Sequence, residues 1–246
     1  MQYRKRFYGQ KLAFTLAEIL ITLGIIGVIA AMSVPMLITS TQKIITSKKV
    51  ARFYSITNNA VKLSTSENGS LAENPDVPLS GAQYKDIYAY IQKYYMPYLN
   101  LLSCKGFKHK KVSGGGQYSA AACTMVDGNI MVVSPAGYNN SVGSRIFITL
   151  VTDERCLKED VWYHPRCAFV FSLNNFYTES TGTYNKVGNQ EEYIIPYQEE
   201  WDGKYESLYK KGTKYSCSQK YSKYPNYCAK YIQESGWKIP HNYPWL

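Results

Sequence analysis

The sequence predicts an α+β protein in which one long N-terminal helix packs on an antiparallel sheet. Residues 14–38 form an apolar stretch with a single charged residue. Apolar residues then recur at helical spacing to about residue 63, and short β-branched and aromatic runs follow after residue 120. The chain has 246 residues, enough for one membrane-proximal helix and one globular domain.

The apolar stretch Phe14–Ile38 has 25 residues, more than the roughly 20 needed to cross the hydrocarbon core of a bilayer. Four positive residues and no acid precede it: Arg4, Lys5, Arg6 and Lys11. By the positive-inside rule, the leader stays in the cytoplasm and the chain after residue 40 is exported. We therefore expect a single-pass protein of the inner (cytoplasmic) membrane with an extracytoplasmic domain.

Glu18 is the charged residue inside this stretch, and three interpretations account for it. A secretory signal peptide cut near Met32 or Ser33 has no need for the carboxylate. An uncleaved anchor would carry a penalty of roughly 2.5–3.5 kcal/mol for a carboxylate near its centre, and less near its end. In the third interpretation the carboxylate has a partner, which makes it functional.

The sequence AFTLAE at residues 13–18, followed by an aliphatic run to Pro35, resembles the N-terminus of type IV prepilins and type II secretion pseudopilins. The resemblance implies that a prepilin peptidase cuts between Ala13 and Phe14 and methylates the new amine. The residue before the cut is usually Gly in that family, and Ala13 is also small. The resemblance further implies that Glu18 pairs with the amine of Phe14 on a neighbouring subunit of a filament.

This interpretation divides the chain into a leader at 1–13, a transmembrane and filament-core helix at 14–38, an amphipathic continuation at 39–67 and a head at 68–246. The helix is expected to kink at Pro35 and to stop at Asn68-Gly69. Its second half carries an apolar face that should lie on the head. That face comprises Val50, Phe53, Tyr54, Ala60, Val61 and Leu63.

In the head, residues 84–102 are predicted to form a second, aromatic-rich helix. Residues 121–133 predict a β-hairpin, because Asp127-Gly128 separates two apolar runs. Residues 145–153 and 167–175 predict further strands. Residues 227–245 predict one short helix and an irregular tail. The expected fold is therefore the pilin architecture, a long helix on an antiparallel sheet.

The six cysteines of an exported domain are most simply interpreted as disulfides. Six cysteines allow 15 connectivities. Pairing neighbours in the chain closes the shortest loops at the lowest entropic cost. The favoured pairs are Cys104 with Cys123, Cys156 with Cys167, and Cys217 with Cys228.

No catalytic motif is present, so we expect no enzyme and no cofactor. The histidines His109, His164 and His241 lie in no nucleophile–base or metal motif. A zinc site at His164 and its neighbouring cysteines is disfavoured against a disulfide. Calcium is possible in the loop at 176–200, as in major pseudopilins, but a solvated loop is favoured. The loop offers Glu179, Asn185, Asn189, Glu191 and Glu192.

The segment Lys204–Lys230 contains seven lysines, one acid and interleaved tyrosines. Lysine neutralises phosphates and tyrosine stacks on bases, as in proteins that hold single-stranded nucleic acid. The alternative interpretation is a solvated, disulfide-closed loop. The candidate nucleic-acid contacts are Lys210, Lys211, Lys214, Lys220, Lys223, Tyr215, Tyr221 and Tyr224.

The function predicted on these grounds is that of a structural subunit of a type IV pilus or a type II secretion pseudopilus. Ala13 and Phe14 would define processing and methylation, and Glu18 and Pro35 would serve assembly. The expected partners are the prepilin peptidase, other pilin or pseudopilin subunits and the inner membrane. The alternative is a pilin-like protein of DNA uptake, whose Lys- and Tyr-rich region binds nucleic acid.

Overall fold

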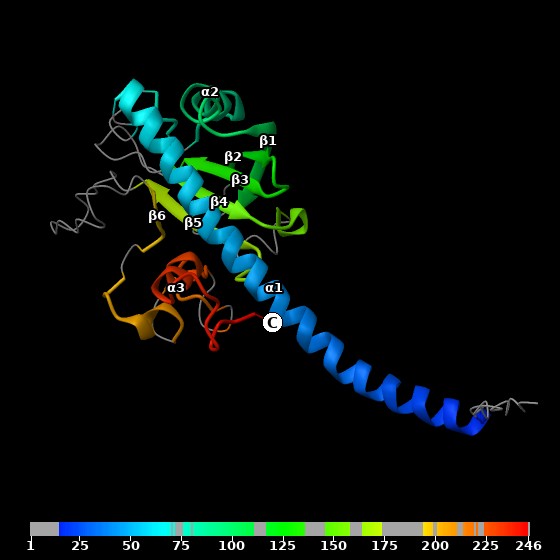
Figure 1. The fold of residues 1–246 in the computed structure, drawn as a ribbon. Coiled ribbons are helices and arrows are strands. Elements are labelled where there is room, and N and C mark those ends of the chain that lie inside the picture. The colour runs from blue at the N-terminus through cyan, green and yellow to red at the C-terminus, as the bar shows by residue number, and fades with distance from the viewer. Residues whose placement is uncertain are drawn as a thin grey trace, which may run out of the picture. The chain divides into compact units, whose positions relative to one another are not determined.

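The computed structural model describes residues 15–69, 71, 76–79, 81–110, 117–135, 146–157, 164–173, 194–198, 201–210, 214–218, 220 and 224–245. The chain separates into two compact units, Met1–Lys43 and Ile44–Leu246. The first unit contains the beginning of helix α1. The second contains the remainder of α1 and the other described elements (Figure 1).

Helix α1 runs from Leu16 to Asn68, which confirms the predicted long helix. The helix continues through Pro35 without a break. At its end, the Gly69 N–H donates to the carbonyl of Thr65 at 2.9 Å. Gly69 has a φ of +78°, the left-handed conformation that commonly ends helices and that glycine adopts without strain. The predicted stop at Asn68-Gly69 therefore has a clear local cause.

The second unit is built on one six-stranded sheet in which consecutive strands are neighbours and every pair is antiparallel. This meander confirms the antiparallel sheet of the predicted α+β class. The strands are β1 (Leu101–Lys110), β2 (Gln117–Met125), β3 (Ile130–Pro135), β4 (Ile146–Val151), β5 (Ala168–Leu173) and β6 (Ile194–Pro196).

The hairpin between β2 and β3 is the one that Asp127-Gly128 predicts. The Met125 carbonyl accepts from the Gly128 N–H at 3.0 Å, and the Met125 N–H donates to the Asn129 carbonyl at 2.8 Å. Gly128 has a φ of +77°. These bonds describe a three-residue loop with a left-handed residue at its end, a common hairpin connection.

Within the second unit, α1 packs one face on the sheet. Val50, Phe53, Ala60 and Val61 are buried, and the Phe53 ring lies 5.4 Å from that of Phe171 in β5. Thr57 and Ser64 are buried as well, and with Val50, Phe53 and Ala60 they recur at intervals of three or four residues, so they line one side of the helix. Leu63 was placed on this face by the sequence pattern, but it is 53% exposed and points to solvent.

The second helix is shorter than predicted. Helix α2 runs from Tyr84 to Tyr94, whereas the expected range extended to residue 102. A turn at residues 95–98 follows, and Leu101 begins β1. Pro97 explains the early end, because the residue before a proline is disfavoured in helical conformation.

The two edge strands, β1 and β6, were not predicted. β6 has three residues, and its open edge is paired by a side chain of α1. Asn58 Oδ1 accepts from the Ile194 N–H at 2.7 Å, and Asn58 Nδ2 donates to the Ile194 carbonyl at 3.3 Å. The side-chain amide thus makes the two bonds that a neighbouring strand would make. Pro196 lacks an N–H and is tolerated on such an edge.

Both faces of the central strands are buried. Ala121, Met131 and Val133 belong to the main core beneath α1 and α2. Their neighbours Ala122 and Val132 belong to a smaller cluster on the opposite face. Burial on both faces explains why these strands appear as continuous apolar runs in the sequence.

The C-terminal part contains the 3₁₀ turn η2 (Tyr205–Leu208) and helix α3 (Cys228–Glu234), which confirms the predicted short helix. α3 ends where the Trp237 N–H donates to the Ile232 carbonyl and the Gly236 N–H donates to that of Gln233. Gly236 and Trp237 both have positive φ. The Trp237 ring then lies 5.0 Å from that of Tyr54 in α1.

Candidate functional site

The N-terminus of α1 is organised around Thr15 and Glu18. The Thr15 N–H donates to Glu18 Oε2 at 2.8 Å, and the Thr15 hydroxyl donates to the same oxygen at 2.9 Å. In return, the Glu18 N–H donates to Thr15 Oγ1 at 3.2 Å. The Thr15 carbonyl accepts the first helical bond, from Ile19. This reciprocal arrangement is a capping box, with Thr15 as N-cap and Glu18 three residues later.

Sequence reasoning identified Glu18 but missed Thr15. The spacing Thr-x-x-Glu ahead of an apolar run is itself the signature of a capping box. The signal was therefore present at residues 15–18, and it also explains why the helix begins at Leu16.

The capping box leaves part of the Glu18 carboxylate available. All three bonds use Oε2 or the backbone N–H, so Oε1 has no partner within the described chain. None of the described lysines or arginines forms an ion pair with Glu18. The N-terminal end of the helix dipole favours a negative charge here, but it does not cancel it. Ala13 and Phe14, the predicted processing residues, lie outside the described residues.

The surface around Glu18 is apolar. Leu16 is 78% exposed and Leu20 is 62% exposed, and the large apolar side chains that follow as far as Ile38 are exposed as well. By length and composition, α1 is a helix that can cross a membrane. A carboxylate with one oxygen that no described residue binds therefore lies on a helix surface suited to lipid or to other apolar helices.

Pro35 lies far from Glu18 along the same helix. Seventeen residues separate them, about 26 Å at 1.5 Å per residue. The Thr39 hydroxyl donates to the Pro35 carbonyl at 3.0 Å, and the Ser33 hydroxyl donates to that of Ile29 at 2.9 Å. Neither bond reaches the Ala31 carbonyl, which is the one that loses its helical N–H donor because of Pro35. The two predicted assembly residues thus belong to one element but not to one site.

In the head, the six cysteines form three disulfides, in the pairing that chain order favoured. The pairs are Cys104–Cys123, Cys156–Cys167 and Cys217–Cys228. The first joins β1 to β2, the second links η1 (Glu154–Leu157) to the start of β5, and the third links the 214–218 turn to α3. Disulfides are typical of exported domains.

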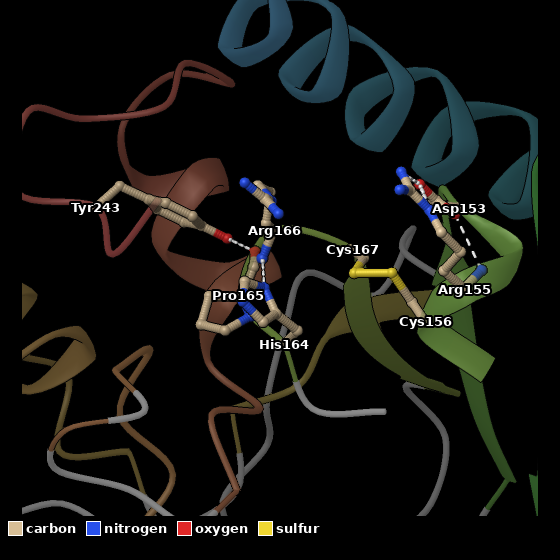
Figure 2. Close-up of a disulfide and its surroundings, with 8 residues drawn as sticks. All are labelled: Asp153, Arg155, Cys156, His164, Pro165, Arg166, Cys167 and Tyr243. Carbon is tan, nitrogen blue, oxygen red and sulfur yellow. Dashed lines mark hydrogen bonds and ion pairs between the residues drawn. A yellow bond between two sulfur atoms is a disulfide. The ribbon is translucent and has the colours of Figure 1, made fainter. Parts of the chain in front are cut away.

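The Cys156–Cys167 disulfide has a polar neighbourhood that joins three parts of the head (Figure 2). The buried Tyr243 hydroxyl donates to the Pro165 carbonyl, which ties the C-terminal tail to the turn before Cys167. The Arg166 N–H donates to His164 Nδ1 at 3.2 Å. Beside the other cysteine, Arg155 Nε donates to both oxygens of Asp153 at 3.0 Å.

The surroundings shift the pKa values of Asp153, His164 and Tyr243. The hydrogen bonds from the Arg155 side chain lower the pKa of Asp153 to about 2. Burial, followed by the charge of Arg166, lowers the pKa of His164. Burial raises the pKa of Tyr243 well above its usual value. The cluster is therefore held by fixed donors and acceptors around neutral pH, and its described residues include no nucleophile hydrogen-bonded to a base.

Cys156 and Cys167 are joined as a disulfide, so in this structure neither offers a thiolate to a metal at His164. Within the described parts of the chain, no group of three or more His, Cys, Asp or Glu side chains converges as metal ligands would. The possible calcium ligands at 179, 185, 189, 191 and 192 lie outside the described residues.

The Lys- and Tyr-rich segment is divided between core and surface. Tyr215, a candidate for base stacking, is 8% exposed, and its ring packs 5.1 Å from that of Tyr197. Its ring face is therefore not open to a base, and Tyr224 is half-buried. The candidate lysines Lys210, Lys214 and Lys220 are exposed. The candidates Lys211, Tyr221 and Lys223 lie outside the described residues.

A model of a family of unknown function, DUF6613, matches residues 36–246. The chain belongs to the DUF6613 family. No curated protein and no solved structure matches it.

The DUF6613 match begins at Met36, directly after Pro35. It includes the later part of α1, the whole sheet and the three disulfides. Thr15 and Glu18 precede it. The DUF6613 region therefore corresponds to the head and the helix that supports it, while the capping box lies in the segment before the family match.

Proposed function

We propose that this chain is a structural subunit of a filament of the type IV pilus or type II secretion pseudopilus class. It is made with a cytoplasmic leader, cut between Ala13 and Phe14 by a prepilin peptidase, and methylated on the new amine. It is held in the inner membrane by the first part of α1, and it polymerises through that helix.

The observation that carries the proposal is the Glu18 carboxylate on an otherwise uncharged apolar helix surface. Its Oε2 is bound by Thr15 of the same chain, while Oε1 has no partner among the described residues. The amine of Phe14 on a neighbouring subunit supplies the missing positive charge. Such pairing offsets the cost of burying the carboxylate only when subunits pack together, so Glu18 sets the register of addition.

The processing step is tested by intact-mass and N-terminal peptide mass spectrometry on the protein from its native membrane. The expected chain begins at N-methylated Phe14. A chain beginning near Ser33 identifies a cleaved signal peptide, and a chain beginning at Met1 identifies a simple anchor; either result overturns the proposal.

The role of Glu18 is tested by two variants that separate its charge from its cap. Glu18→Gln keeps a carbonyl oxygen that accepts from Thr15 but has no charge. Thr15→Val removes the capping hydroxyl, worth about 1 kcal/mol, and keeps the charge. We expect Glu18→Gln to reduce assembled filament at least tenfold and Thr15→Val to reduce it no more than a few-fold. The reverse order would mean that Glu18 serves only to start the helix.

A nucleic-acid function is the second candidate, and the exposed Lys210, Lys214 and Lys220 favour it. Replacing all three by Ala should weaken single-stranded DNA binding by the full-length chain and flatten its salt dependence, because each phosphate contact contributes to that slope. If the Glu18→Gln variant assembles no filament but still binds DNA, the two functions are separate.

A further inference from the structure

The outer edge of β1 presents backbone groups that no strand of the described sheet uses. The N–H and carbonyl of Met125 make their hydrogen bonds on the β3 side of β2. Along an antiparallel strand, the N–H and carbonyl of successive residues point alternately to one neighbouring strand and to the other. Cys123 therefore also faces β3, and its partner Cys104 faces away from β2. Their Cα atoms are 4.0 Å apart, which agrees with the close spacing of a non-hydrogen-bonded pair.

A side chain confirms this direction. The Tyr84 hydroxyl of α2 donates to the Cys104 carbonyl at 2.9 Å, as expected for a carbonyl that points out of the sheet. By the same alternation, the N–H and carbonyl of Gly106 and of Lys108 also point outward. Within the described residues, Tyr84 is the group that reaches this edge, and it satisfies one acceptor there.

The backbone of β1 is also held in place, by a disulfide and by the ring of Tyr84. The Cys104–Cys123 disulfide ties β1 to β2. The Tyr84 ring lies directly over Gly106, where an added Cβ would come within 3.2 Å of its Cγ. An edge that is already ordered loses little conformational entropy when a further strand pairs with it.

The charge of β1 indicates what kind of strand it accepts. The strand contains Lys105, Lys108 and Lys110 and no acid. Lys105 Nζ forms an ion pair with Glu154 Oε1 at 3.0 Å. Lys108 is exposed, and it has no ion-pair partner in the described chain. A second copy of β1 would place lysine near lysine, which is destabilising. An acidic strand would place carboxylates there.

We propose that the outer edge of β1 is a strand-addition site for an extended, acidic segment of a partner protein. The partner pairs with the outward groups of Gly106 and Lys108, and its carboxylates lie beside the exposed Lys108 side chain. Backbone hydrogen bonds supply affinity in this mode of recognition, and the flanking charges select the partner. The inference does not depend on filament assembly.

The test uses the full-length chain in detergent micelles and a fluorescent peptide of alternating Glu and Val, read by anisotropy. Lys108→Pro removes the outward N–H without removing a β1–β2 bond, and Lys108→Ala is its matched control, which loses only the charge. We expect a several-fold weaker Kd for Lys108→Ala and at least a further tenfold loss for Lys108→Pro. Equal losses in the two variants would overturn strand addition, because they would show attraction by charge alone.

Amide hydrogen exchange on the unmodified chain gives an answer even if Lys108→Pro fails to fold. Saturating peptide should slow exchange at Gly106 and Lys108 and leave Phe107, which already faces β2, unchanged. An unchanged exchange rate at Gly106 and Lys108 would overturn the proposal. So would equal binding of a control peptide of the same sequence that is N-methylated at every residue, since that peptide has no N–H to donate to the edge.

Discussion

Asn58 joins the helix to the sheet through two hydrogen bonds from one side chain, at 2.7 and 3.3 Å from Ile194. Replacing it by Ala leaves the N–H and carbonyl of Ile194 without these partners. A loss of about 1–3 kcal/mol in the free energy of unfolding is expected, because buried groups left unpaired bear their full desolvation cost. Urea denaturation of the full-length chain in detergent measures it.

The neighbouring Asn59→Ala is the matched control, because Asn59 is exposed on the same helix. Its effect should stay within about 0.5 kcal/mol, as for surface substitutions in general. Equal losses for the two variants would contradict the role given to Asn58 and would indicate an effect on the helix alone.

Single residues differ in how far the sequence reveals them. Glu18 is evident because it is the only charge in an apolar stretch, whereas Thr15 was missed although its spacing to Glu18 is that of a capping box. Asn58 could not be found, because its partner lies 136 residues away and no local pattern joins them. The burial of Tyr215 was hidden for the same reason, since its ring packs on Tyr197 from another part of the head.

At the scale of elements, the Cys217–Cys228 disulfide fixes α3 to the turn before it. Its loop spans 11 residues, and both cysteines are fully buried. Replacing both by Ser should lower the free energy of unfolding by about 2–4 kcal/mol, through loss of the cross-link and burial of two hydroxyls. Thermal unfolding of the oxidised full-length chain measures this loss, and the Cys217→Ala/Cys228→Ala variant isolates the contribution of the cross-link. An unchanged midpoint in both variants would mean that packing alone holds α3.

The central elements were predictable and the edges were not. β2, β3, β4 and β5 are buried, so their apolar runs stand out in the sequence. β1 contains Gly106 and three lysines, which suit an edge but depart from the usual strand composition. β6 is too short to be recognised. The end of α2 was signalled by Pro97, although the apolar residues beyond it suggested a longer helix.

At the scale of the whole molecule, the ionisation of Asp153 makes the free energy of unfolding depend on pH. Its pKa is about 2 in the folded chain, against an ordinary value of 3.8, because Arg155 donates to its carboxylate. A group with a depressed folded pKa stabilises the fold above its unfolded pKa, and this contribution is lost as the pH falls through about 2. Asp153→Asn should therefore destabilise the chain at pH 6 and make little difference near pH 2.

Thermal midpoints measured from pH 2 to pH 6 provide the comparison. Arg155 is mostly exposed, so the difference should shrink in high salt. Glu206→Gln removes an exposed carboxylate and controls for net charge. A constant difference between Asp153→Asn and the unmodified chain across this range would show that the ion pair does not cause it.

The organisation of the whole chain could be predicted in outline. An apolar stretch followed by apolar residues at helical spacing predicts one long helix. Runs of β-branched and aromatic residues that are separated by turn residues predict an antiparallel sheet packed against it. The division at Lys43 and Ile44 was not evident, because a single helix continues across it. The function of the head was also beyond pattern reasoning, since its matched family has no known function.

The two hydrogen bonds between the Asn58 side chain and the backbone of Ile194 have a mechanical consequence. A pull along α1 acts on the sheet through the two hydrogen bonds to Ile194 in β6 and through the Phe53–Phe171 contact with β5. β6 is the shortest strand of the described sheet and lies at its edge, so rupture should begin there rather than in the disulfide-tied β1–β2 pair at the opposite edge. The sheet thus has one edge that yields under tension and one edge that is covalently locked.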